Sequence, residues 1–247
     1  MNARIEALVV AAGKYHDIDF ARLQLLTLLA ELPQVRATVA PDYAPIVAGG
    51  ARFAFMVTYT CDLMPSPDET RAIADWLAAG GRWLALHGTN SILRFTEAGV
   101  DAPDERPDVM ELLGTQFVAH PPIGSFRVEI ADPDDPLVAG IADFDVVDEL
   151  YLSRTTAPIR TLARTRFAGE ATGFVDADWP DTEVPIVYTR DVGSGRIVYN
   201  TLGHCRGHWD LPGMQDHYPH PERCAWNYPV YHELLRRGLR WAARSAD

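Results

Sequence analysis

The chain has 247 residues, of which 34 are acidic and 22 basic, so its formal net charge at pH 7 is −12. This negative charge argues against nucleic acid or an anionic membrane surface as a partner and fits a neutral or cationic small molecule. Three cysteines are too few, and odd in number, for a disulfide framework, and no apolar run approaches the roughly 20 residues that cross a bilayer. We expect a cytoplasmic protein in which residues 1–247 form a single domain.

The amino-terminal part of the chain alternates short apolar runs with amphipathic ones. The expected order is strand 5–12, helix 20–32, strands 35–40 and 53–60, helix 67–79 and strand 82–87. The second helix has a clear start signal, with Ser66 as N-cap, Pro67 at the first helical position and Glu69 three residues after the cap. This alternation predicts a flavodoxin-like, doubly wound α/β fold, with a mostly parallel sheet and helices on both faces.

The rest of the chain predicts an antiparallel extension of that sheet and a last helix. We expect a short helix at 109–113, strands at 125–130, 144–152, 160–167, 185–188 and 196–201, a loop at 169–183, and a helix at 231–243. Gly193-Ser194-Gly195 lies between the last two strands and indicates a hairpin turn, because glycine accepts positive φ.

Histidines stand at the ends of apolar runs or in tight polar turns at four places: His16, His87, His120 and His204. Three of them follow a predicted strand, at the edge where open α/β sheets bind ligands. His87 is the most informative, because the run from Arg82 ends on it and Gly88 follows at once. Imidazole serves acid–base chemistry or binds zinc, and purely structural roles are a further alternative that the sequence leaves open.

An acidic pair, Asp148 and Glu149, ends another β-like run, and Tyr151 follows two residues later. In an extended chain Glu149 and Tyr151 share a face. Glu149 is therefore a candidate general base or metal ligand, and Tyr151 a candidate donor to a sugar hydroxyl. The alternative is a solvated strand edge.

The segment from His204 to Tyr228 is dense in histidine and aromatic residues, among them His208 and Trp209. We interpret it as a lid whose aromatic faces stack on a sugar. The alternatives are a loop packed on the surface, or a zinc site made of Cys205, His208, His217, His220 and Cys224. No glycine-rich nucleotide motif occurs, so no nucleotide cofactor is expected.

In order and spacing, these pieces resemble the ThuA-like family, the trehalose-utilisation proteins that share the class I glutamine amidotransferase-like fold. The matching stretches cover nearly the whole chain and are 13–17, 80–87, 113–121, 132–136, 148–151, 185–190, 193–199 and 202–204. In class I amidotransferases the elbow after the corresponding strand carries a nucleophilic cysteine. Here that position is His87, so glutaminase activity is not expected.

The resemblance implies carbohydrate metabolism, because ThuA-like proteins are linked to trehalose and related disaccharides, often beside oxidoreductases that make 3-keto sugars. It implies a keto-sugar hydrolase, lyase or isomerase that uses histidine and carboxylate acid–base chemistry. We expect His87, Glu149 and His204 to be catalytic, and Tyr151, Asn90, His208 and Trp209 to bind the sugar. His16 and His120, with His87 or His204, would hold a divalent metal such as zinc.

Two other function classes compete with this interpretation. One is a non-catalytic sugar-binding or regulatory module on the same fold. The other is an amidase or peptidase with Cys61 as nucleophile, because Cys61 ends the third predicted strand. A small-molecule sugar is the expected partner, and a homodimer is left open.

Overall fold

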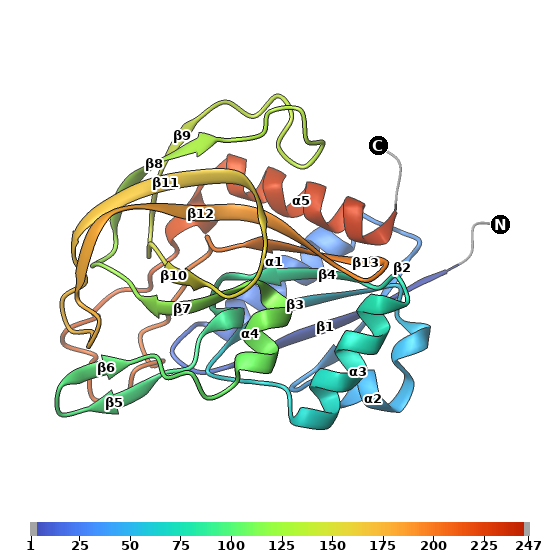
Figure 1. Cartoon of the computed structure of the whole chain (residues 1–247), viewed down its shortest axis with the longest axis horizontal. Coiled ribbons are helices and arrows are strands. Elements are labelled where there is room, and N and C mark those ends of the chain that lie inside the picture. Colours follow the sequence, from blue (N-terminus) through green and yellow to red (C-terminus); the bar gives the residue numbers. More distant parts are fainter. Residues whose placement is uncertain (1–3, 245–247) are drawn as a thin grey trace.

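The computed structural model describes residues 4–244, and these form a nine-stranded sheet with helices packed on both faces (Figure 1). The strand order is β2-β1-β3-β4-β13-β12-β11-β8-β9. The first five strands are parallel to one another: β2 (Val35–Ala40), β1 (Ile5–Gly13), β3 (Phe55–Cys61), β4 (Arg82–Leu86) and β13 (Gly195–Asn200). This half confirms the predicted flavodoxin-like, doubly wound arrangement.

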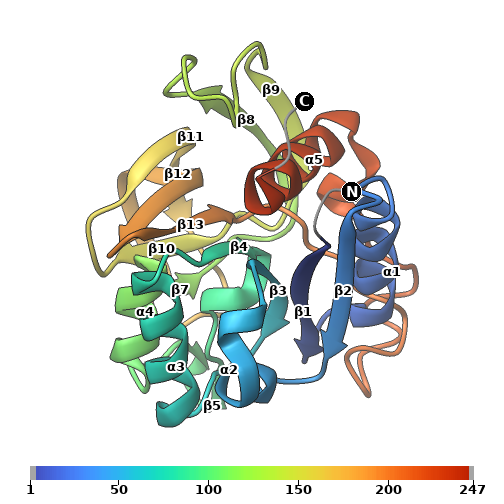
Figure 2. The same cartoon turned by 90° about the vertical axis from the view of Figure 1, so that its right-hand side faces the viewer.

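The helices form two layers, one on each side of the parallel strands (Figure 2). One layer is α1 (Ile18–Leu29) and α5 (Pro229–Ala243), and the other is α2 (Ala44–Gly49), α3 (Pro67–Ala78) and α4 (Pro107–Leu113). Alternate residues of β1 enter the two layers, Val9 on the α1 side and Leu8 on the α2 side. Because both faces of the inner strands β1, β3 and β4 are largely buried, the sequences of these strands are apolar along most of their length.

Helix α3 begins as its sequence predicts. The backbone N–H of Ser66 donates to Glu69 Oε2 at 2.7 Å, and the N–H of Glu69 donates to Ser66 Oγ at 3.4 Å. This reciprocal pair is a capping box, with Pro67 at the first helical position. No helix within residues 4–244 is both long enough and apolar enough to span a membrane.

The other half of the sheet is antiparallel and contains β12 (Asp178–Val192), β11 (Arg160–Glu170), β8 (Gly124–Ile130) and β9 (Phe144–Asp148). The loop predicted over 169–183 is wrong for about half of its length, because β11 covers 169–170 and β12 covers 178–183, and the two strands form a long hairpin. Its charged residues are cross-strand partners, since Arg164 pairs with Glu183 at 2.8 Å and Arg166 with Asp181 at 2.7 Å. Exposed ion pairs thus gave this hairpin a loop-like composition.

The single strand predicted over 144–152 is also wrong. Strand β9 ends at Asp148, and after a three-residue connection β10 (Leu152–Thr155) pairs with β7 (Thr115–Ala119) in a separate two-stranded sheet. Glu149 therefore lies at the junction between the large sheet and this small one.

The sequence patterns did not predict α2, β7 or the hairpin of β5 (Arg94–Thr96) and β6 (Gly99–Asp101). Short 3-10 turns are η1 (Gly50–Arg52), η2 (His87–Asn90) and η3 (Cys224–Asn227).

Candidate functional site

Three histidines meet at the carboxyl edge of the parallel strands. His16 follows β1, His87 follows β4 and His204 follows β13. Their exposed fractions are 6%, 0% and 0%, respectively, and Nε2 of His87 lies 2.9 Å from Nε2 of His16. The sequence thus placed three of its four candidate histidines at one site, the edge at which open α/β sheets bind ligands.

A strained elbow aims His87 at this site. Its φ is +44°, in the left-handed region that non-glycine residues seldom adopt. The turn is tight, since a Cβ on Gly88 would lie 2.6 Å from the carbonyl oxygen of Thr60. The hydroxyl of Tyr199 donates to the His87 carbonyl at 2.6 Å and accepts the N–H of Asn90 at 2.9 Å. These contacts hold the elbow in its strained conformation.

Glu149 completes the cluster from the junction between β9 and β10. Its Oε2 lies 3.1 Å from Nδ1 of His204 and 3.7 Å from Nε2 of His87, and the residue is 3% exposed. The alternative of a solvated strand edge is therefore wrong. The neighbouring buried Asp148 fixes the backbone, because its carboxylate accepts the N–H groups of Gly203 at 2.7 Å, His204 at 3.1 Å and Glu149 at 2.8 Å.

The outer ring nitrogen of each clustered histidine donates to an oxygen acceptor. Nδ1 of His16 donates to the Lys14 carbonyl at 3.1 Å, and Nδ1 of His87 donates to the Thr201 carbonyl at 2.9 Å. Nε2 of His204 donates to Glu222 at 2.9 Å. A carbonyl or carboxylate accepts only, so these partners place a proton on each outer nitrogen and turn the inner nitrogens toward the centre.

The pKa values of the clustered residues are shifted in different directions. Burial, and then the neighbouring His87 and His204, hold the pKa of His16 well below its ordinary value. Burial opposes the charged form of His204, but the carboxylates of Glu149 and Glu222 raise its pKa to about 9. Burial likewise opposes ionisation of Glu149, yet His120 and His204 hold its pKa well below the ordinary value. Glu149 is therefore an anion at neutral pH.

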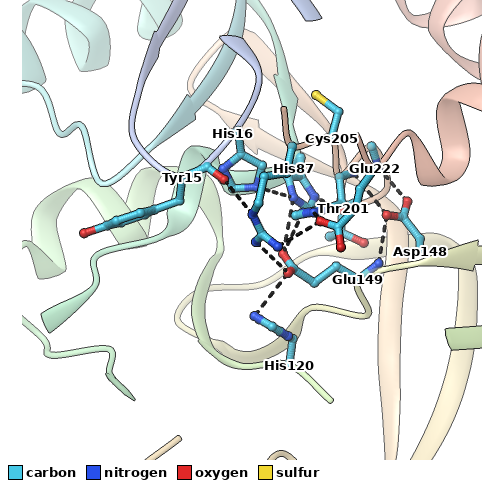
Figure 3. Close-up of polar contacts among 12 residues, drawn as sticks. Tyr15, His16, His87, His120, Asp148, Glu149, Thr201, Cys205 and Glu222 are labelled. Carbon is cyan, nitrogen blue, oxygen red and sulfur yellow. Dashed lines mark hydrogen bonds and ion pairs between the residues drawn. The ribbon is translucent and has the colours of Figure 1, made fainter. Parts of the chain in front are cut away.

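His120 lies on the outer side of Glu149, away from His16 and His87 (Figure 3). It follows β7; its Nε2 is 3.2 Å from Glu149 Oε1, and its Nδ1 donates to the Pro121 carbonyl at 2.9 Å. The side chain is 26% exposed, in contrast to the buried cluster. Burial lowers its pKa, although Glu149 opposes this shift. Of the two histidines expected to complete a metal site, only His16 joins the buried group.

The four residues expected to bind sugar occupy different environments. Tyr151 is buried, and its ring lies 4.3 Å from that of His87 and 6.4 Å from that of His120. Asn90 is fully buried, and its Nδ2 donates to Thr115 at 2.8 Å, so it supports the elbow. Trp209 is 74% exposed and contacts the ring of His208 at 4.8 Å.

The cysteine-based alternatives receive no support from the geometry. Among residues 4–244, one group of potential metal ligands brings its donor atoms within 4.8 Å of one another, and it consists of His16, His87, Glu149 and His204. Cys205 instead contacts the Tyr59 hydroxyl at 3.1 Å. Cys61 is 1% exposed, and burial, followed by the charge of Glu149, raises the pKa of its thiol, which disfavours a nucleophilic thiolate.

Sequence reasoning missed two residues that join the segment after β13 to the cluster. Arg206 donates to Glu222 at 2.8 Å, and its Nη2 lies 3.7 Å from Glu149 Oε1. The backbones of Arg206 and Glu222 also pair, so residues 207–221 form a loop closed at its base. No sequence pattern connects two residues sixteen positions apart in this way, and the only signal was their place in the histidine-rich segment.

Fold and site together define a flavodoxin-like α/β protein whose carboxyl edge holds a buried histidine–glutamate cluster. The sequence profile of the ThuA family, described as trehalose utilisation, matches residues 51–220, which is more than half of the chain. The chain therefore belongs to the ThuA family, and the match includes His87, His120, Glu149 and His204. No curated protein matches it.

Solved structures that share this fold include those of two ThuA-like proteins. A ThuA-like protein from Bacteroides uniformis is 16% identical, with a TM-score of 0.66 over 98% of this chain and 93% of its own. One from Parabacteroides merdae is 17% identical, with a TM-score of 0.65 over 97% and 90%. A protein from Salmonella typhimurium LT2, described as cytoplasmic, is 14% identical, with a TM-score of 0.55 over 96% and 99%.

Proposed function

We propose that this ThuA family protein is a carbohydrate-processing enzyme that removes a proton beside the ketone of a 3-keto sugar, with keto-disaccharides related to trehalose as the substrate class. One observation carries the proposal. A partly exposed imidazole, that of His120, stands 3.2 Å from the buried carboxylate of Glu149, which itself contacts the histidines at the carboxyl edge of the parallel strands. The three buried histidines, His16, His87 and His204, lie on the other side of that carboxylate.

His120 is suited to act as the general base. Its Nδ1 proton is held by the Pro121 carbonyl, so in the neutral ring Nε2 carries the lone pair. Burial lowers its pKa and so favours this neutral form at neutral pH. When Nε2 takes a proton, the Glu149 carboxylate beside it stabilises the imidazolium. His87 and His204 were the earlier candidates for this role, but neither has exposed surface that a substrate can reach.

For a glycoside whose ring carries a ketone at C3, the proposed reaction is a β-elimination. His120 takes the proton from C2, and the electron pair of the C–H bond moves into an enolate on the ketone oxygen. The enolate then collapses and expels the glycosidic oxygen from C1, which leaves an α,β-unsaturated ketone. The proton on His120 passes to the departing oxygen, so a β-elimination needs no further reagent.

Aromatic side chains beside His120 support a sugar as the ligand. The ring of Phe174 meets that of His120 edge to face at 4.7 Å, and Tyr151 stacks parallel to it at 6.4 Å. The half-buried ring of Phe174 can present an apolar face to the C–H face of a pyranose, whereas the buried ring of Tyr151 packs against His120. The net charge of −12 favours a neutral substrate, and the free, buried cysteines Cys61, Cys205 and Cys224 fit a reducing compartment such as the cytoplasm.

The test is to follow 3-keto-trehalose and related keto-disaccharides by NMR with the purified protein in D₂O. We expect deuterium exchange at C2 together with loss of the glycosidic bond. His120→Gln should lower the rate at least about 100-fold, the usual contribution of a general base. His220→Gln is the matched control, because His220 is exposed and outside the site, and it should leave the rate unchanged.

Two results would overturn the proposal. Saturable binding of these sugars without exchange or cleavage would identify a sugar-binding module instead. Full activity of His120→Gln would show that another group takes the proton.

A further inference from the structure

We propose that His16, His87, His204 and Glu149 form a binding site for one divalent transition-metal ion. This deepens the proposed function, on which it rests for the role of the ion in the reaction but not for its binding. The four residues come from the ends of β1, β4 and β13 and from the β9–β10 junction, and their donor atoms all lie within 4.8 Å of one another.

The first argument is the close approach of two imidazole nitrogens. His16 and His87 each donate the Nδ1 proton to a backbone carbonyl, so in the neutral rings both Nε2 atoms carry lone pairs. These atoms are 2.9 Å apart, and both side chains are buried. Two facing lone pairs repel each other, whereas a cation beside them is attracted to both.

The second argument is that the same cluster contains buried polar atoms without hydrogen-bond partners. Nδ1 of His204 and Oε1 of Glu149 are both in this state. Buried polar atoms almost always have a hydrogen-bond partner, because a buried polar atom without one has lost its hydration and gained nothing in return. Nδ1 of His204 and Oε2 of Glu149 form an ionic contact at 3.1 Å without hydrogen-bond geometry, and a bound ion would take the place of the proton on Nδ1.

The third argument is the set of hydrogen bonds that the outer ring nitrogens of the three histidines make. The outer nitrogens of His16, His87 and His204 donate to the Lys14 carbonyl, the Thr201 carbonyl and the Glu222 carboxylate. Histidines that ligate metals are usually oriented in this way, because the outer hydrogen bond fixes the ring and makes the inner nitrogen more basic. The donor atoms of the three histidines and of Glu149 lie within 4.8 Å of one another, and Figure 3 shows His16 and His87 next to Glu149.

The donor set decides the kind of ion. Three imidazole nitrogens with one carboxylate suit zinc, cobalt, nickel or iron in the divalent state, whereas magnesium and calcium prefer oxygen ligands. His120 is outside the donor group, although its Nε2 is 3.2 Å from Glu149 Oε1, so it remains free to contact the substrate. When bound, the ion would supply positive charge near the substrate, which stabilises the negative charge that develops on the ketone oxygen.

The test measures binding without any sugar. The full-length protein is stripped with a chelator and dialysed, then titrated with Zn²⁺ by calorimetry and with Co²⁺ by visible absorption. We expect one ion per chain. X-ray absorption of the zinc-loaded wild type should show about three imidazole ligands and no sulfur. This measurement uses the wild-type protein alone, so it does not depend on whether any variant folds.

Variants assign the ligands. Glu149→Gln and His16→Ala should each weaken binding at least about 100-fold, because even loss of an outer partner typically costs 10–100-fold. His120→Gln, beside the same carboxylate, should bind with unchanged affinity, and so should the triple variant of His208, His217 and His220 to Gln. Circular dichroism checks that each variant is folded.

The proposal is overturned if the wild type binds no stoichiometric ion, if sulfur appears among the ligands, or if Glu149→Gln and His16→Ala bind as the wild type does. Binding as expected, without turnover of any keto sugar, would keep the metal site and overturn the proposed function. Turnover by the stripped protein, together with unchanged metal binding by Glu149→Gln and His16→Ala, would keep the proposed function and overturn the metal site.

Discussion

A single buried carboxylate, Asp148, holds together the backbone of two site residues. Its oxygens accept three backbone N–H groups, from Gly203, His204 and Glu149. Asp148→Asn replaces one acceptor oxygen with a donor, so at least one of these N–H groups loses its partner. We expect the free energy of unfolding in urea to fall by about 1–3 kcal/mol. Asp145→Asn, an exposed carboxylate on the same strand, should change it by less than about 0.5 kcal/mol.

The elbow at His87 depends on the absence of a side chain at the next position. A Cβ at residue 88 would lie 2.6 Å from the Thr60 carbonyl oxygen and 2.9 Å from Cys61 Cβ, so the backbone must move. For Gly88→Ala we expect a loss of about 1–3 kcal/mol in the free energy of unfolding, together with weaker metal binding, because His87 shifts. Gly124→Ala is the control, since its Cβ has a nearest neighbour at 3.6 Å. Equal stability of the two variants would show that the elbow relaxes freely.

At the scale of elements, the loop of residues 207–221 is joined to the cluster through one carboxylate, Glu222. It accepts from His204 Nε2 at 2.9 Å and from Arg206 Nη1 at 2.8 Å. Glu222→Gln keeps the size of the side chain but removes the charge behind His204. We expect about 10–100-fold weaker Co²⁺ binding with little change in melting temperature. Asp216→Asn, an exposed carboxylate in the same loop, should match the wild type in both measurements, and equal affinity in the two variants would argue against this orienting role.

The elements differ in how far their sequences predict them, and burial explains the difference. β1 and β3 are apolar along most of their length because both faces are covered, so a local pattern is sufficient to identify them. β12 has one buried half, part of which was predicted as the strand 185–188, and one exposed half with ion-paired charges, residues 178–183, which was interpreted as a loop. The histidines His16, His87 and His204 were predictable, because strand ends follow from apolar runs.

Glu149 was predictable as a candidate, but its partners were not. Its position depends on where β9 leaves the large sheet and β10 joins β7, and long-range strand pairing leaves no local mark in the sequence. The same holds for the Arg206–Glu222 pair and for the exclusion of His120 from the donor group. Such distances arise between residues far apart in the chain, and only the assembled sheet fixes them.

At the scale of the whole molecule, the cluster joins the two halves of the fold. Three proposed ligands lie at the ends of parallel strands, and the fourth follows β9, the edge strand of the antiparallel half. An ion bound only by the folded chain stabilises it by about 2.7 kcal/mol at a free concentration 100 times the Kd. At about 2–4 °C per kcal/mol for a chain of this size, we expect Zn²⁺ to raise the melting temperature of the stripped protein by about 5–10 °C in calorimetry. Glu149→Gln should show little of this rise, whereas His120→Gln should show all of it. A rise of the same size in Glu149→Gln would mean that zinc stabilises the molecule from some other site, and that the two halves are held together at the cluster by protein contacts alone.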